Sequence, residues 1–311
     1  MKNVLVTIGI AVLVALTACN KNDNLLPEDQ LNEVDLKTTT ESVIVTEASL
    51  DDVTEAADYE VDLFTGSDIE VASAAFEASD LELKAGDQHK YRNRYRWGKC
   101  PDIHIVKEEG GYPRTITLNY GEGTELTNGR VIAGIIEIVM SGPRRENGAT
   151  RTVTFIDFSV DDVAIAGTSI KTFLKDEYKV NIVRDMSFTL PEDGTVIERT
   201  AEKTRTWVAG MDTPFDHSDD VINITGYTNC EDSDGNSYNR EITTALVKNG
   251  ECRYIVAGEI TLTKNGVEFG VINYGDGKCD NIATLTTAEG TKEFEIGKRH
   301  RQRKQDQNKD S

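Results

Sequence analysis

The spacing of hydrophobic residues changes its period along this chain. After residue 86, runs rich in β-branched residues follow one another, and many alternate between apolar and polar positions. In the run 254–263, Val256 and Ile260 fall on one side and Glu259 and Thr261 on the other, as expected of a strand with one buried face. Similar runs occupy residues 130–140, 152–160, 180–190 and 242–247. The pattern predicts β-strands.

Turn residues separate these runs. Gly- and Asn-containing steps lie at residues 192–194, 234–236, 264–266 and 289–290. Short strands at roughly ten-residue spacing with hairpin turns are typical of antiparallel meanders and sandwiches, and no βαβ rhythm is present. We therefore predict an all-β domain over residues 90–297, an antiparallel meander or sandwich-like body with a sizeable core.

Between residues 41 and 89 the spacing becomes helical. An i, i+3, i+4 stripe is formed by Val53, Ala56, Ala57, Leu63 and Phe64. Candidate N-terminal caps are Ser49, Asp51 and Asp52. A second, shorter stripe is formed by Ile69, Ala72 and Phe76. The segment 41–89 is thus predicted to be acidic and partly helical, and either docks on the β domain or serves as an arm that binds a partner.

The first residues carry a targeting signal. A positive start is followed by an apolar run from Val4 to Leu16, and 13 residues at about 1.5 Å each cover roughly 20 Å, less than the roughly 30 Å of a bilayer core. The run therefore indicates a signal peptide, residues 1–18, and not a transmembrane helix. The sequence Leu16-Thr17-Ala18-Cys19 resembles the lipobox of bacterial lipoproteins, which implies cleavage before Cys19 and acylation of its sulfur. Several acyl chains on one residue anchor a protein stably.

The net charge of −20 is concentrated in one segment. Residues 20–89 hold 19 acidic and three basic side chains, a net −16, whereas residues 90–311 hold 35 and 30, a net −5, and Lys2 supplies +1. Residues 19–40 are polar and are expected to form the lipid anchor and a flexible tether. The basic tail, residues 298–311, is expected to be disordered and solubilising.

Two segments of the β domain echo each other. Residues 116–123 and 271–277 share Asn-Tyr-Gly-acid-Gly at the end of a predicted strand, and residues 130–138 resemble residues 253–262. Residues 206–210 resemble both members of the second pair. The echoes predict two related β modules packed as one body.

This combination resembles a family of uncharacterised Bacteroidota cell-envelope lipoproteins. The likeness rests on the Cys19 lipobox, the acidic linker and the repeated Tyr-Gly-acid-Gly segments, here residues 121–130 and 275–283. The resemblance implies an envelope location and a β fold, and no activity. We expect an outer-membrane lipoprotein with the membrane as partner through the lipid on Cys19.

Four cysteines remain after lipidation of Cys19, an even number in an externally exposed compartment. Cys252 and Cys279 flank the second repeated turn, which favours their pairing, and Cys100 with Cys230 follows by elimination. Four free thiols are the alternative. No zinc-ligand spacing occurs, and we expect no metal and no cofactor.

Catalytic motifs are missing from the sequence, but one carboxylate pair offers an alternative. Glu122 and Asp276 occupy matching positions in the two repeats and would suit an envelope glycan hydrolase if the modules faced each other. The simpler interpretation is that both acids belong to glycine turns. No nucleophile elbow, phosphate loop or paired histidines are present.

Aromatic residues provide the binding hypothesis. In residues 91–97, aromatic and arginine side chains alternate, so that a strand would present aromatics on one face and Arg92, Arg94 and Arg96 on the other. The aromatics belong to the core or to a sugar-stacking platform, and the arginines bind anions or hold the acidic segment. We predict a non-enzymatic binding or structural module for a glycan or protein partner, with contacts through Tyr95, Trp97 and Trp207, and no role with nucleic acid.

Overall fold

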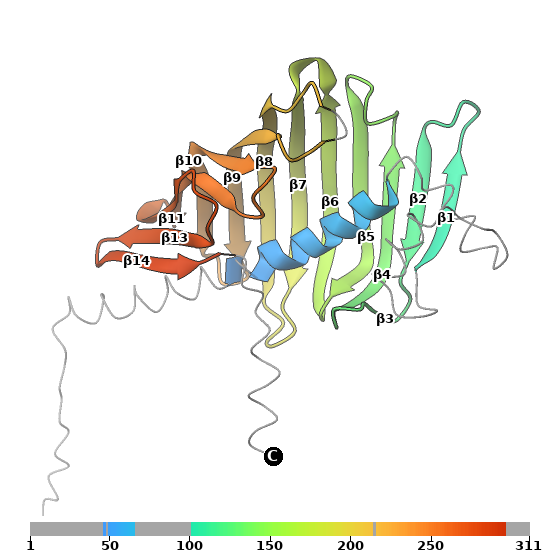
Figure 1. The fold of residues 1–311 in the computed structure, drawn as a ribbon. Coiled ribbons are helices and arrows are strands. Elements are labelled where there is room, and N and C mark those ends of the chain that lie inside the picture. Colours follow the sequence, from blue (N-terminus) through green and yellow to red (C-terminus); the bar gives the residue numbers. More distant parts are fainter. Residues whose placement is uncertain (1–45, 48, 66–100, 214–215, 297–311) are drawn as a thin grey trace, which may run out of the picture. The chain divides into compact units, whose positions relative to one another are not determined.

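The computed structural model describes residues 46–47, 49–65, 101–213 and 216–296 (Figure 1). Residues 46–47 and 49–64 are helical, and we refer to residues 46–64 as the acidic helix because seven of its side chains are acidic and none is basic. The remainder forms a β domain. The strands are β1 (Asp102–Lys107), β2 (Arg114–Asn119), β3 (Thr124–Glu125), β4 (Val131–Met140), β5 (Ala149–Val160), β6 (Val163–Leu174), β7 (Lys179–Thr189), β8 (Val196–Ala209), β9 (Val221–Asp232), β10 (Ser237–Asn249), β11 (Ile255–Lys264), β12 (Val267–Asp276), β13 (Ile282–Thr287) and β14 (Gly290–Glu295).

The described strands form one antiparallel sheet in the order of the sequence. Each strand from β4 to β13 pairs with the next, β2 pairs with both β1 and β4, and the short β3 pairs with β4. The all-β, antiparallel prediction is confirmed. The predicted runs correspond to β4, β5, β7, β10 and β11, and the four predicted turns connect successive strands. Alternation is also confirmed in β11, where every second residue from Val256 to Leu262 is buried.

The two repeated sequence segments have the same local structure at two positions in this one sheet. Asn119 at the end of β2 accepts a hydrogen bond from the Gly121 amide at 2.9 Å, and Asn273 near the end of β12 accepts one from the Gly275 amide at 2.8 Å. The neighbouring strands β4 and β11 each have a bulge at an Ala-Gly step, at Gly134 and Gly258. The repeat therefore encodes an Asx turn beside a bulge.

Glycines at several bulges allow neighbouring backbones to approach closely. A Cβ on Gly134 would lie 2.0 Å from the Asp157 carbonyl oxygen, and one on Gly226 would lie 2.0 Å from that of Glu202. Both residues have a positive φ, which a side chain rarely tolerates. Such kinks increase the local twist of a sheet and bend its strands.

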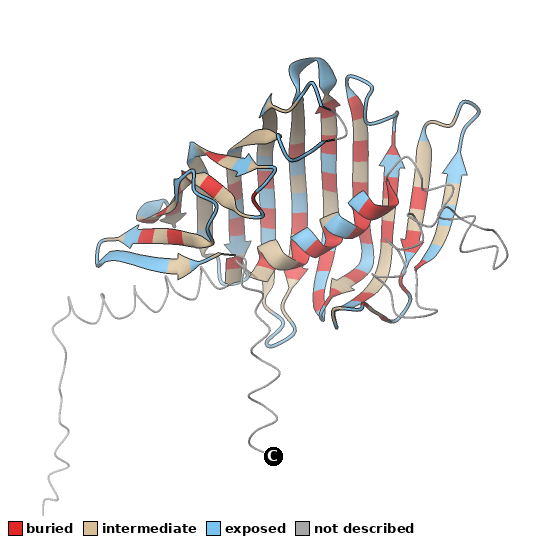
Figure 2. Ribbon diagram, in the orientation of Figure 1, coloured by how far each residue is buried: buried red, intermediate tan, exposed pale blue. Residues whose placement is uncertain are grey.

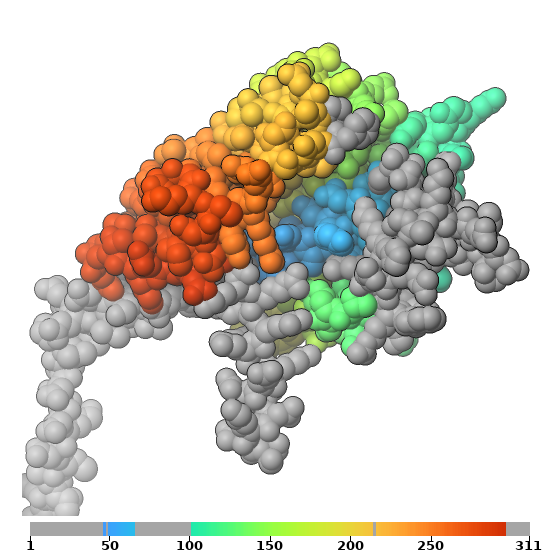
Figure 3. Space-filling model, viewed as in Figure 1, coloured from blue at the N-terminus to red at the C-terminus, as the bar shows by residue number. Residues whose placement is uncertain are grey.

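The acidic helix packs on one face of the sheet, which we call the inner face (Figure 1). Its apolar residues share a core cluster with the apolar side chains of β2, β4, β5 and β6 (Figure 2). Leu50, Phe64, Ile136 and Phe158 are all at most 1% exposed. Part of the opposite side of the helix reaches the molecular surface, as Figure 3 shows, where Glu55 and Tyr59 are exposed. The predicted stripe of the helix is thus buried as expected.

The predicted helix start is wrong. Ser49, Asp51 and Asp52 are not N-terminal caps, because residues 46–47 are already helical. Asp51 and Asp52 instead point to arginines of the β domain. The second predicted stripe, at Ile69, Ala72 and Phe76, lies outside the described residues.

One of the two expected cysteine pairs is formed. Cys252 and Cys279 form a disulfide with their Cα atoms 5.6 Å apart. The pair of Cys100 with Cys230 is not formed in this structure, because Cys230 is a free, buried thiol on β9 beneath the acidic helix. Burial and the Glu47 carboxylate raise the pKa of Cys230, and its thiol donates a hydrogen bond to Glu47 Oε1 at 2.9 Å. Cys100 lies outside the described residues.

The bulge glycines give a test of the fold. We expect Gly134→Ala to lower the free energy of unfolding by about 3 kcal/mol or more, because overpacking against a fixed backbone adds about 1–3 kcal/mol to the cost of a positive φ. Gly129→Ala is the matched control: its φ of +83° equals the +82° of Gly134 within a degree, but no atom lies within 4 Å of the added Cβ. It should cost about 1 kcal/mol. Equal losses in urea unfolding would show that the close approach is unimportant.

Candidate functional site

The inner face carries a band of basic side chains. They alternate with outward-facing residues on β5 to β8 and on β10, so that each projects toward the side on which the acidic helix lies. The seven residues are Arg151, Lys171, Arg184, Arg199, Lys203, Arg205 and Arg240. We call them the basic band. Buried cations are costly unless acids neutralise them.

The first half of the acidic helix neutralises the part of the band on β8 and β10. Asp51 lies 2.5 Å from Arg199 Nη2 and 2.7 Å from Arg240 Nη1. Glu47 lies 3.2 Å and 3.1 Å from the same two nitrogens. Two carboxylates and two guanidiniums thus form one cluster at this end of the helix.

The second half of the helix engages β5, β6 and β7. Asp58 pairs with Arg184 and lies 3.7 Å from Lys171 Nζ. Asp62 lies 2.7 Å from Nη1 of Arg151, which is fully buried and also donates a hydrogen bond to Thr65 at 2.7 Å. The acids at positions 47, 51, 58 and 62 therefore follow the band strand by strand.

The tyrosines of the two repeats also reach this interface. Tyr120, after β2, donates a hydrogen bond to the buried carboxylate of Glu60 at 2.8 Å. Tyr274, near the end of β12, lies beside Arg240. Burial raises the pKa of Tyr274 despite the opposing charge of Arg240. The duplicated Asn-Tyr-Gly turns thus serve the same contact from strands that are far apart in the sheet.

The electrostatics of the interface follow from burial and charge together. Burial alone would raise the pKa of Asp51, but the charges of Arg240, Arg199 and Lys203 outweigh it and hold the pKa well below its usual range. Burial lowers the pKa of both Lys171 and Lys203 to about 8. Asp51 is therefore firmly ionised, whereas these two lysines lose much of their preference for the charged form.

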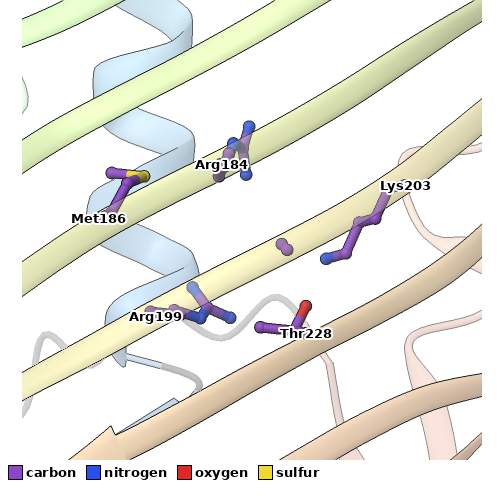
Figure 4. Close-up of a pocket in the computed structure, with 6 residues that line it drawn as sticks. Arg184, Met186, Arg199, Lys203 and Thr228 are labelled. Atoms are coloured by element: carbon purple, nitrogen blue, oxygen red, sulfur yellow. The ribbon is translucent and has the colours of Figure 1, made fainter.

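A small cavity lies within the basic band. Its volume is about 10 Å³, room for roughly one water molecule. Its polar lining consists of Arg184, Arg199, Lys203 and Thr228, with Met186 and Ala201 as apolar neighbours (Figure 4). None of the described residues that line it is a carboxylate. Among the described residues, no group of acidic, histidine and cysteine side chains is arranged to hold a metal ion.

The opposite, outer face of the sheet carries a different set of residues. Tyr227 on β9 lies between Glu202 on β8 and Glu241 on β10, and the next row consists of Thr200, Asn229 and Asn239. We call these six residues the outer patch. The Tyr227 hydroxyl forms a hydrogen bond with Glu202, which raises the pKa of the tyrosine. Asn239 donates to the Asn229 side-chain oxygen at 2.6 Å. The patch combines an aromatic ring with exposed carboxylates and amides.

The two carboxylates of the alternative hydrolase hypothesis lie far apart. Glu122 lies in the turn after β2 and Asp276 at the end of β12, with eight strands between them in the sheet order. At about 4.8 Å per strand the two positions are about 43 Å apart along the sheet, whereas a glycosidase pair requires about 5–9.5 Å. Both side chains are exposed, and a hydrogen bond and the charge of Lys278 lower the pKa of Asp276. A general acid needs the opposite shift.

The predicted binding residues are only partly described. Tyr95 and Trp97 lie outside the described residues, as does Cys19. Trp207 is half-buried near the end of β8, on the same face as Arg205. It is therefore on the inner face and not beside the outer patch.

Sequence reasoning missed the arginines that hold the acidic segment. The sequence suggested Arg92, Arg94 and Arg96, which lie outside the described residues. In the structure, the acidic helix pairs with Arg151, Arg184, Arg199 and Arg240. A signal was available in residues 198–205, where acidic and basic residues alternate as Glu198, Arg199, Glu202, Lys203 and Arg205. In a strand this order places acids on one face and bases on the other.

Comparison with protein-family models, curated proteins and solved structures found no match to this chain. Within the described part of the chain, the helical segments fall short of the length and apolarity needed to cross a membrane.

The ion pairs of Asp58 give a test of the interface. Asp58→Asn leaves Arg184 and Lys171 without this carboxylate on the inner face, and we expect the free energy of unfolding to fall by about 3–5 kcal/mol. Glu55→Gln is the matched control, because Glu55 is on the same helix but exposed. It should change stability by at most about 0.5 kcal/mol. Similar urea midpoints for the two variants would refute a stabilising role for the Asp58 ion pairs.

Proposed function

We propose that the protein is a lipid-anchored, non-enzymatic module of the bacterial cell envelope, at the outer membrane, that binds a neutral glycan through the outer patch. The observation that carries the binding proposal is the position of Tyr227 between Glu202 and Glu241 on the outer face. An aromatic ring offers an apolar surface to the C–H face of a sugar. Carboxylates and amides around it accept and donate hydrogen bonds to hydroxyl groups.

Charge restricts the class of glycan. Glu202 and Glu241 are both exposed, and no basic residue belongs to the outer patch. An anionic polymer would be repelled, since like charges at close range are unfavourable. The proposal therefore commits to an uncharged glycan. A protein partner is the competing outcome of the test below.

The anchor follows from the sequence of residues 1–19. The apolar run and Leu16-Thr17-Ala18-Cys19 support lipidation of Cys19, after which the tether leads to the acidic helix. The 27 peptide steps from Cys19 to residue 46 allow a separation of at most about 90 Å. The helix, through its ion pairs with the basic band, joins this anchored segment to the sheet.

The support for a non-enzymatic role comes from the described residues alone. Their basic cavity has room for about one water molecule, and the carboxylates of Glu122 and Asp276 belong to widely separated turns. The outer patch is a surface and not a pocket. Such a surface suits the recognition of an extended chain rather than the enclosure of a reacting bond.

Lipidation is tested by replacing the modified cysteine. In Cys19→Ser we expect the chain to lose incorporation of labelled palmitate and to leave the membrane fraction, because the acceptor sulfur is gone. Cys230→Ala is the control and should keep both the label and the membrane association. Retention of the label in Cys19→Ser would place the lipid elsewhere and would overturn the anchor proposal.

Glycan binding is tested with an array of neutral and charged glycans and the full chain in detergent. We expect binding to a neutral glycan, weakened at least about tenfold in Tyr227→Ala, as for a stacking residue worth about 1.4 kcal/mol or more. Tyr178→Ala is the control, because Tyr178 is an exposed tyrosine between β6 and β7, away from the patch. A silent array together with a reproducible protein captured from the envelope would replace the glycan by a protein partner.

A further inference from the structure

The acids and bases of the inner face do not balance. The basic band has seven cations, whereas the acidic helix contributes the carboxylates of Glu47, Asp51, Asp58 and Asp62 to it. Counted over the described residues alone, the band has three more cations than carboxylates paired with it. Uncompensated buried charge is costly, so either a lysine loses its proton or an anion is bound.

Part of this excess lies at the cavity, at Lys203. Arg184, Arg199 and Lys203 line it, and within the described part of the chain Lys203 has no carboxylate within 4.0 Å. Arg199 is only 6% exposed, and its Nε has no hydrogen-bond partner among the described residues, although its Nη2 is paired. Figure 4 shows Lys203 extending back toward Arg199 and Thr228. Three cationic groups and one hydroxyl thus line a space whose described lining includes no carboxylate.

The acids of the helix that pair with the band are unevenly spaced. Asp51 and Asp58 lie seven residues apart on the stripe that faces the band, and position 54 between them is threonine. The Thr54 hydroxyl donates to the Leu50 carbonyl at 2.6 Å and so remains with its own helix. The helix supplies no carboxylate at this point of the stripe.

We propose that the cavity binds one small monovalent anion of the size of chloride, held by Lys203 Nζ, Arg199 Nε, the Arg184 guanidinium and the Thr228 hydroxyl. The volume of about 10 Å³ is close to that of one water molecule, which favours a single-atom anion over polyatomic anions such as phosphate or acetate. The four groups are donors, and three carry charge, which is the composition a halide requires. This site lies on the inner face and is independent of the proposed glycan surface.

The experiment compares chloride with gluconate, an anion too large for the cavity, at constant ionic strength. For the full chain in detergent we expect the thermal midpoint to be about 2–4 °C higher in chloride, since a ligand that binds only the folded state stabilises it. Lys203→Met should abolish this difference. Lys171→Met is the matched control, because Lys171 is a second buried lysine of the band that does not line the cavity. It should keep the difference.

Direct binding is measured by the broadening of the ³⁵Cl resonance on addition of the protein. We expect the unmodified chain to broaden the resonance, and bromide to reverse the broadening by displacing bound chloride. The Lys203→Met variant should cause no broadening. Thr228→Val replaces the hydroxyl by a methyl group and is the variant to measure if Lys203→Met does not fold. It should weaken anion binding at least tenfold. Equal midpoints in chloride and gluconate with no broadening, or broadening that survives both substitutions, would overturn the site and indicate that the cavity holds water.

Discussion

The structure depends on neutralising a layer of cations that a β-sheet would ordinarily expose. A wide meander has two faces, and here one face carries both a core cluster, to which β2, β4, β5 and β6 contribute, and the basic side chains of β5 to β8 and of β10. Neither half is stable uncovered, because the apolar part must be shielded from water and the basic part must find counter-charges. The acidic helix meets both needs with two different sides. Its apolar residues enter the core cluster, and its acids follow the basic band.

This arrangement gives the acidic segment a structural meaning that its composition alone would not suggest. An acidic, weakly apolar stretch is often a solvated linker. Here Glu47, Asp51 and Asp58 form ion pairs with basic side chains of the sheet. The lowered pKa of Asp51 reflects how strongly its charged form is favoured there. In the proposed lipid-anchored protein, the same contact joins the segment that follows Cys19 to the β domain.

Strands and turns could be predicted from the sequence, because period-two alternation and Gly or Asn steps are signals carried by residues adjacent in the sequence. The interface could not be predicted in the same way. Which arginine meets which carboxylate depends on strand order and on the path of the helix, so Arg151 and Asp62, 89 positions apart, give no local signal. The prediction of N-terminal caps was wrong for a related reason. Asp51 and Asp52 have side chains suited to a cap, but they lie inside the helix and pair with arginines from elsewhere in the chain. The outer patch was likewise invisible, because Tyr227 becomes a neighbour of Glu202 and Glu241 only through pairing.

The division of charge between the two faces has a consequence for how the strands find their partners. In β8, Glu198 and Glu202 point outward while Arg199 and Lys203 point inward. If β8 slid by one residue against β7 and β9, every side chain would change faces. The glutamates would then enter the buried layer, and the helix would meet carboxylates with its own carboxylates. Alternating charge thus disfavours a misaligned sheet, because the acidic helix would then lie against carboxylates that have no counter-charge.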